Sequence, residues 1–178
     1  VDQRKAIRHL ERRWVRVISQ ADPQLVHVLV EVPGFGLDVF QYFLEHKAMY
    51  PDVALLLAHE EAVERGVRYI DEDLNRVFGL EKNGNIERAL STEILSVLSL
   101  DSIVLDIHTT TSDIGEMVPI VKHMNLSIQQ VLSTIQRPRI AYMQAGLGDH
   151  ALISQVAKGI SLEFYDVYAT KREAVQEV

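Results

Sequence analysis

The segment Ser102-Ile103-Val104-Leu105-Asp106-Ile107-His108 decides the fold class of this chain. Its apolar run has the length of a buried β-strand, and it ends in a histidine that precedes the hydroxyl residues 109–112. Because open α/β sheets keep their ligands at the carboxyl ends of their strands, we expect His108 at a binding site. Asp106 lies on the same face of the strand and is expected to hold one imidazole nitrogen. A structural histidine that only caps the strand end is the alternative.

Similar short apolar runs recur along the chain and alternate with amphipathic segments. The expected strands are residues 25–32, 53–57, 102–107, 116–121, 139–143 and 160–164. The expected helices are residues 37–47, 85–98, 127–135 and 149–157, whereas residues 58–73 are expected to be a mixed loop. This alternation predicts an α/β fold with helices on both faces of a mostly parallel sheet.

Residues 1–20 are strongly basic and differ from the rest of the chain. Their apolar residues recur at steps of three and four, which predicts an amphipathic helix. These residues are Ile7, Leu10, Trp14, Val17 and Ile18. We expect this helix to pack its apolar stripe on an acidic body formed by a single domain, residues 21–178. A role at a membrane surface or at an anionic partner is the alternative.

Composition excludes several classes of function. The chain has 178 residues, is 47% hydrophobic and carries a net charge of −7, which is typical of a globular domain and argues against a nucleic-acid partner. It has no cysteine, so disulfides, cysteine zinc sites and thiol nucleophiles are excluded. No apolar run approaches the length of a membrane span, and no signal segment opens the chain, so we expect a cytoplasmic protein without a membrane partner.

The segment Arg68-Tyr69-Ile70-Asp71-Glu72-Asp73-Leu74-Asn75-Arg76-Val77-Phe78, called here the arginine segment, concentrates polar residues around a short apolar core. Arg68, Asn75 and Arg76 are candidates for a carboxylate clamp with a carbonyl-polarising guanidinium. A solvated loop, in which the arginines pair with the acidic residues of the same segment, is an equal alternative.

Glu163 lies within the apolar run of residues 160–164. Burial in such a strand would suit its carboxylate to general base catalysis. A glutamate on an edge strand that faces water is the alternative.

The arginine segment and residues 105–115, Leu-Asp-Ile-His-Thr-Thr-Thr-Ser-Asp-Ile-Gly, together resemble the aspartoacylase and succinylglutamate desuccinylase family. Members of this family are zinc-dependent deacylases of the carboxypeptidase-like superfamily. The resemblance covers roughly residues 25–165 and implies a three-layer α/β/α fold with a mixed, mostly parallel sheet. It corresponds to the family's catalytic domain, and we expect the family's C-terminal β-rich region to be absent.

The resemblance also implies a role for each matching residue of the arginine segment. Arg68 would polarise the scissile carbonyl and stabilise the oxyanion. Asn75 and Arg76 would bind the carboxylate of the substrate, and Asp73 would hold this clamp in place. The expected partner is therefore a small carboxylate-bearing substrate or ligand.

His108 would be the third zinc ligand of the family, and Glu163 would activate the zinc-bound water and then protonate the leaving amine. The family's first two zinc ligands come from a His-Gly-Asn-Glu motif, where this chain has Pro33-Gly34-Phe35-Gly36. A catalytic zinc needs about three protein ligands. An active enzyme would therefore take the missing ligands from other residues, for which the candidates are His27, Glu31, Asp38 and His59.

These observations leave three hypotheses. The first is a zinc-dependent deacylase that hydrolyses the amide bond of an N-acyl amino acid. The second is a degenerate family member that binds a small carboxylate metabolite without turnover. The third is a structural or regulatory subunit. Self-association into a homo-oligomer is left open.

Overall fold

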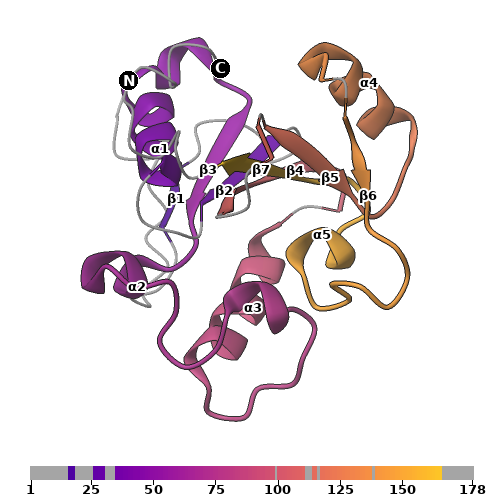
Figure 1. The fold of residues 1–178 in the computed structure, drawn as a ribbon. Coiled ribbons are helices and arrows are strands. Elements are labelled where there is room, and N and C mark those ends of the chain that lie inside the picture. Colours follow the sequence, from indigo (N-terminus) through magenta and orange to yellow (C-terminus); the bar gives the residue numbers. More distant parts are fainter. Residues whose placement is uncertain are drawn as a thin grey trace.

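The computed structural model describes residues 16–18, 26–30, 35–98, 100–110, 114–115, 117–137 and 139–165 (Figure 1). These residues form a seven-stranded sheet in the order β1-β3-β2-β4-β7-β5-β6. The strands are β1 Arg16–Ile18, β2 Val26–Val30, β3 Val53–Leu57, β4 Ile103–Thr110, β5 Val118–Val121, β6 Ala141–Tyr142 and β7 Gly159–Tyr165. The pairs β2–β3, β2–β4, β4–β7 and β5–β6 are parallel, whereas β1–β3 and β5–β7 are antiparallel. The predicted mixed and mostly parallel sheet is confirmed.

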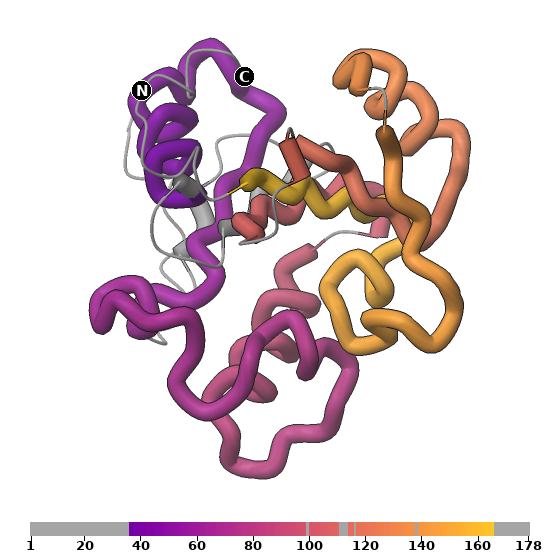
Figure 2. Tube along the Cα trace, viewed as in Figure 1, coloured from indigo at the N-terminus to yellow at the C-terminus, as the bar shows by residue number. Residues whose placement is uncertain are grey.

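Helices cover both faces of this sheet (Figures 1 and 2). The α-helices are α1 Phe35–Glu45, α2 Glu60–Arg65, α3 Ile86–Val97, α4 Leu126–Ile135 and α5 Leu152–Gln155, and the short 3-10 helices are η2 Lys47–Met49 and η3 Leu74–Arg76. α1 and α4 lie on one face, and α3 and α5 lie on the other (Figure 1). The three-layer α/β/α prediction is confirmed. Among the described residues, no helix combines the length and apolar character needed to cross a membrane.

Each face has its own apolar core, and β4 contributes to both. Leu105 and Ile107 pack on the side of α1 and α4, whereas Val104 packs on the side of α3 and α5. Because side chains alternate along a strand, Asp106 and His108 share the face of Val104. This face also receives the arginine segment, whose buried members are Leu74, Val77 and Phe78.

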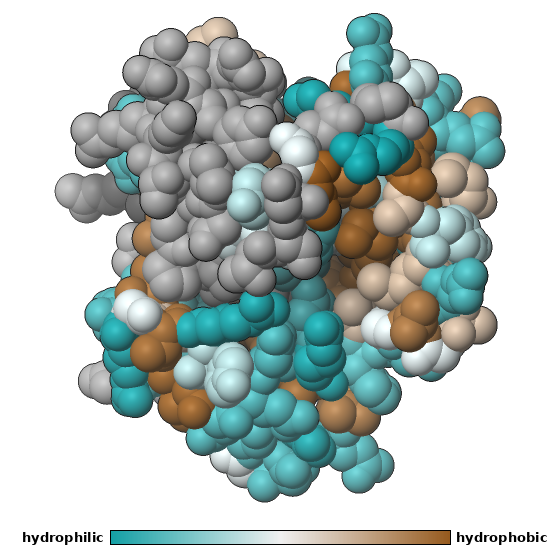
Figure 3. Space-filling view, in the orientation of Figure 1, coloured by the Kyte–Doolittle hydropathy of each residue, from teal (hydrophilic) through white to brown (hydrophobic). Residues whose placement is uncertain are grey.

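Polar and apolar surfaces are unevenly distributed on the side of the molecule shown in Figure 3. Hydrophilic residues gather over the lower part, where α3 and the loops beside it lie, and hydrophobic residues gather on the right. The described residues with large exposed apolar side chains include Met124, Leu126, Ile140, Tyr142 and Leu147.

Three local expectations are wrong. Residues 16–18 form a strand paired with Leu55–Leu57, because the β-branched Val17 and Ile18 extend the sheet edge instead of ending a helix. The rest of the predicted helix, residues 1–15 and 19–20, lies outside the described residues, as does the tail from Thr170. The predicted loop of residues 58–73 contains α2, and the predicted helix of residues 149–157 is reduced to α5.

Local chemistry explains the two helical differences. α2 has a single fully buried residue, Ala62, so it lacks the apolar periodicity by which helices are found; it is defined by its caps, His59 and the left-handed Gly66. α5 ends at Gln155, because the backbone of the next residue, Val156, is extended with φ −118° and ψ 142°.

Gly159 begins β7 in contact with the chain that leaves α5. A Cβ at this position would lie 2.7 Å from Val156 Cγ2 and 3.0 Å from Ile153 Cα. The second contact is to the main chain, which cannot move aside as a flexible side chain can. Gly159 therefore sets the close packing of α5 on the strand that carries Glu163.

We predict that Gly159→Ala lowers the free energy of unfolding by about 1–3 kcal/mol, because it overpacks this junction. Chemical denaturation followed by circular dichroism measures the change. Leu100→Ala is the control, since Leu100 is 92% exposed and its truncation should change stability by less than about 0.5 kcal/mol. Equal midpoints for wild type and Gly159→Ala would contradict the packing described.

Candidate active site

His108 is buried at the end of β4 between a carboxylate and an amide. Its Nε2 lies 2.7 Å from Asp106 Oδ2 and 2.9 Å from Asn75 Nδ2. An ionised carboxylate only accepts hydrogen bonds, so a proton on Nε2 satisfies the shorter contact. The Asn75 amide then donates to the same Asp106 oxygen across 3.5 Å. The predicted contact between Asp106 and the imidazole is confirmed.

Asn75 joins three elements that are distant in sequence. Its Oδ1 accepts a hydrogen bond of 2.8 Å from the backbone of Leu152 at the start of α5. This bond fixes the orientation of the amide group, so Nδ2 must point toward β4 and His108. The same segment is also tied to the chain before α5, because Phe78 N donates to His150 O and His150 Nδ1 donates to Phe78 O, both at 3.0 Å.

Glu163 lies beside His108 in the sheet. β4 and β7 are parallel neighbours, and His108 is the register partner of Glu163. Glu163 is half-buried, and its Oε1 accepts a 3.2 Å hydrogen bond from Ser161 Oγ. Because β7 lies between β4 and β5, the alternative of a glutamate on an edge strand is wrong.

The two arginines lie at the outer side of their segment. Arg68 Nη2 is 2.9 Å from Asp73 Oδ2, and the Arg68 side chain is 55% exposed. Asp73 Oδ1 also accepts from Asn75 N at 3.0 Å and so caps η3. Arg76 is exposed and donates from Nη1 to Asn75 O at 2.9 Å. Both guanidinium groups thus make these contacts within their own segment.

The zinc expectation is met only in part by the described residues. A ligating histidine whose other nitrogen is held by a carboxylate is the usual arrangement at metal sites, and His108 with Asp106 has it. In addition, Asp106 Oδ1 is buried and has no hydrogen-bond partner in the part of the chain that the structure describes. However, the described residues contain no group of three or more potential ligands. They fit one zinc ligand rather than a complete set.

Two of the candidate replacement ligands are wrong. Asp38 is exposed on α1, which covers the opposite face of the sheet from His108. His59 is buried with both ring nitrogens engaged, since Nδ1 accepts from Ala62 N and Nε2 contacts Glu87 Oε1 at 3.1 Å. The side chain of His27, and residues Glu31, Pro33 and Gly34, lie outside the described part of the chain.

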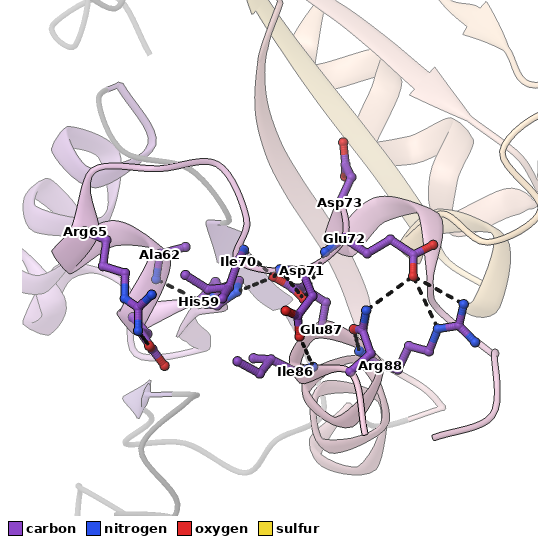
Figure 4. Close-up of polar contacts among 12 residues, drawn as sticks. His59, Ala62, Arg65, Ile70, Asp71, Glu72, Asp73, Ile86, Glu87 and Arg88 are labelled. Carbon is purple, nitrogen blue, oxygen red and sulfur yellow. Dashed lines mark hydrogen bonds and ion pairs between the residues drawn. The ribbon is translucent and has the colours of Figure 1, made fainter. Parts of the chain in front are cut away.

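Glu87 is the polar residue that sequence reasoning missed. Its side chain is fully buried on α3 and faces the main chain of the arginine segment (Figure 4). Oε1 accepts from Ile70 N at 2.6 Å, and Oε2 accepts from Glu72 N at 3.2 Å. Asp71 N lies 3.2 Å from both oxygens.

The pKa of the Glu87 carboxyl is lowered in the folded chain. Burial is the largest effect and acts to raise it, but the hydrogen bonds from Ile70 N, His59 and Asp71 N together outweigh burial. The sequence did carry a signal for this residue. Glu87 shares the α3 stripe of Leu90, Ser91 and Ile94, so a charge stands where the helix faces its core. Ile86, its neighbour on the helix, is only half-buried.

We predict that Asn75→Ala lowers the free energy of unfolding by about 1–3 kcal/mol, because it leaves the Leu152 N–H without its acceptor. Thermal and chemical denaturation measure this change. Gln129→Ala is the control, since Gln129 is exposed on α4 and its truncation should shift stability by less than about 0.5 kcal/mol. An Asn75→Ala variant as stable as this control would show that the bridge adds nothing.

We also predict that Glu87 makes the fold sensitive to acid. Because its folded pKa is lowered, its contribution is fully present above the ordinary value of 4.5 and is lost as the pH falls through the folded pKa. Unfolding free energies measured from neutral to acidic pH should therefore fall less steeply in Glu87→Gln than in wild type. Glu93→Gln, on the same helix, controls for the loss of one negative charge. Parallel curves for Glu87→Gln and wild type would refute the prediction.

Comparison with known proteins agrees with this architecture. Residues 41–173 match the succinylglutamate desuccinylase/aspartoacylase catalytic domain. The chain is 35% identical over 96 residues to an N-acyl-aromatic-L-amino acid amidohydrolase (carboxylate-forming) of Xenopus laevis, a match that covers 48% of this chain and 31% of that protein. It is also 35% identical over 97 residues to a probable aspartoacylase of Trichodesmium erythraeum, covering 48% of this chain and 33% of the relative.

Solved structures share the fold at low sequence identity. Succinylglutamate desuccinylase of Vibrio parahaemolyticus superposes with a TM-score of 0.63 at 13% identity, over 85% of this chain and 54% of that one. An aspartoacylase family protein of Mesorhizobium loti gives 0.58 at 20% identity, over 92% and 58%. The chain thus spans about a third of the curated relatives' length and little more than half of these structures.

The match covers most of the chain and includes His108, Glu163 and the arginine segment. The chain belongs to the succinylglutamate desuccinylase/aspartoacylase catalytic domain family.

Proposed function

We propose that this protein hydrolyses the amide bond of an N-acyl amino acid and releases a carboxylate and the free amino acid. One observation carries the proposal: the Asn75 amide donates to Asp106 Oδ2 at 3.5 Å and so places the arginine segment against the Asp106–His108 pair, with Asn75 Nδ2 2.9 Å from His108 Nε2 and Glu163 as the register partner of His108. The segment that carries Arg68 and Arg76 is thereby held beside the carboxyl end of β4, where the His108 imidazole and the Glu163 carboxylate lie.

Each group has a proposed task. Glu163 takes a proton from the attacking water and returns it to the leaving amine. Arg68 stabilises the oxyanion that develops on the scissile carbonyl, and Arg76 binds the substrate carboxylate. For these roles both guanidinium groups must reach inward from their present exposed positions. The family resemblance assigns Asn75 to substrate binding. Its side chain is already hydrogen-bonded to Leu152 and Asp106, so its proposed task is to anchor the arginine segment at the site.

His108, held by Asp106, would supply one ligand to a zinc ion. Such an ion contributes polarisation of a carbonyl and activation of water. The described residues do not complete its coordination.

A second candidate function is binding of a small carboxylate without turnover. The specific observation in its favour is the loop Pro33-Gly34-Phe35-Gly36, which has neither histidine nor glutamate where the family keeps two zinc ligands. In this case Arg76 would still bind the carboxylate of the ligand, whereas Glu163 would have no catalytic role.

We predict turnover of N-acetyl-L-phenylalanine or N-acetyl-L-aspartate, two probes suggested by the amidohydrolase and aspartoacylase relatives. Glu163→Gln should lower kcat by about 10²–10⁴-fold through loss of the base, and Arg68→Ala by about 10²–10³-fold through loss of oxyanion stabilisation. Arg76→Ala should mainly raise KM. Released amine, measured by a colorimetric amine assay, reports each rate.

The exposed Arg65 of α2 provides the matched control, since Arg65→Ala removes the same charge away from the site. Metal analysis of the wild type and His108→Ala accompanies the assay. Absence of turnover and zinc, with calorimetric binding of either probe lost in Arg76→Ala, would favour the binding protein. Absence of both turnover and binding would refute both functions.

A further inference from the structure

The carboxylate of Glu87 gathers three consecutive backbone amides of the arginine segment, from Ile70 to Glu72 (Figure 4). Consecutive N–H groups in an extended chain would point in alternating directions, so their convergence on one side chain defines a sharp local conformation. A carboxylate has only acceptors and can serve all three, whereas a neutral amide side chain would place a donor against them. Glu87 therefore imposes a shape on this loop rather than merely filling space.

His59 completes the arrangement from the other side. Because Ala62 N donates to His59 Nδ1 at 3.3 Å, the ring proton lies on Nε2 and is donated to Glu87 Oε1. The ring is thus neutral, and its contact with Glu87 is a hydrogen bond rather than an ion pair. His59 lies before Arg68 in the sequence and Ile70 lies after it. Glu87 therefore contacts the chain on both sides of this arginine.

Other contacts between the same loop and α3 are at the surface. Asp71 Oδ2 accepts from Ile86 N at 3.0 Å, and Glu72 Oε2 pairs with Arg88 Nη2 at 3.2 Å. The Glu72 side chain is 38% exposed, and exposed pairs of this kind hold a loop weakly. The buried contact at Glu87 is therefore the one able to set the position of the main chain.

The position of the main chain at residues 70–72 determines where Asn75 lies. Glu72 is three residues from Asn75, and the intervening Asp73 caps the turn through Asn75 N. A shift of the main chain at residues 70–72 must therefore carry Asn75 away from His108 and move Arg68, which pairs with Asp73.

We propose that Glu87, with His59 behind it, is a positioning residue: its carboxylate holds the main chain of residues 70–72 so that the arginine segment presents Asn75 to His108 and its guanidinium groups to the substrate. The kinetic part of this proposal rests on the proposed function. Glu87 itself lies under the loop and acts on the reaction through it.

The test compares Glu87→Gln and Glu87→Asp with the wild-type full chain under conditions in which all are folded. Glu87→Gln replaces an acceptor by a donor, and Glu87→Asp keeps the charge but withdraws it from the amides. Because misplacement by about 1 Å can lower a rate about 10²-fold, kcat/KM for the N-acetyl amino acids should fall about 10- to 100-fold in Glu87→Gln. In an Asn75→Ala background the same change should have a smaller effect, since the route to His108 is already cut and only the route through Arg68 remains.

Two controls separate positioning from stability. Glu93→Gln removes a charge from the same helix, and Ile128→Val lowers the melting temperature from the opposite core. Neither should change kcat/KM of the folded protein. Full kcat/KM in folded Glu87→Gln, or equal effects with and without Asn75, would overturn the proposal.

A second readout is independent of hydrolysis and survives failure of the proposed function. In amide hydrogen exchange of the wild type, Ile70, Asp71 and Glu72 should be protected although they lie outside regular helices and strands. In Glu87→Gln, the Leu152 amide should also lose protection, because its acceptor Asn75 has moved. Unprotected amides at residues 70–72 in the wild type, or an unchanged Leu152 amide in the variant, would overturn the proposal even for an inactive protein.

Discussion

The side-chain amide of Asn75 connects the arginine segment with β4 and α5, across sequence separations of 33 residues to His108 and 77 residues to Leu152. An amide group can satisfy both partners only in one orientation, since its acceptor must face Leu152 and its donor must face β4. The irregular arginine segment has few regular backbone bonds of its own. Its placement therefore depends on this bridge, on the apolar anchors Leu74, Val77 and Phe78, and on Glu87 beneath it.

Two buried carboxylates on this face show how differently burial is compensated. Glu87 is surrounded by donors on both oxygens, so its charge is stabilised by hydrogen bonds in place of water. Asp106 has one oxygen committed to His108, and the other has no partner within the described residues. Glu87 fixes the conformation of residues 70–72, whereas Asp106 Oδ1 can still accept a hydrogen bond beside the imidazole. The two carboxylates thus differ in role: Glu87 supports the main chain of the arginine segment, and Asp106 lies where a ligand could bind.

Periodicity predicted most of the fold, because apolar runs and amphipathic stripes directly record burial. β3 was predicted with its observed bounds, and α3 within one residue at each end.

Elements defined by capping rather than by apolar content escaped this reasoning. α2 is one case, since His59 and Gly66 determine it more than any stripe does. β1 escaped for a different reason, because its three residues become a strand only by pairing with β3. Asp106 and His108 could be paired from strand alternation alone. The bridge to Leu152 could not, because no local pattern relates residues 75 and 152. Glu87 was within reach, as a charge on a buried stripe.

The spacing of His108 and Glu163 has a consequence for how this chain tolerates change. The two residues lie on neighbouring parallel strands, so the backbone ladder between β4 and β7 sets their separation near the usual interstrand distance of about 4.8 Å. The distance between His108 and Glu163 therefore does not change gradually when nearby side chains are substituted. It changes in steps, because a slip of one residue turns Glu163 to the far face of the sheet. Insertions and deletions in this lineage should therefore accumulate in the connections around β4 and β7, while the strands keep their length.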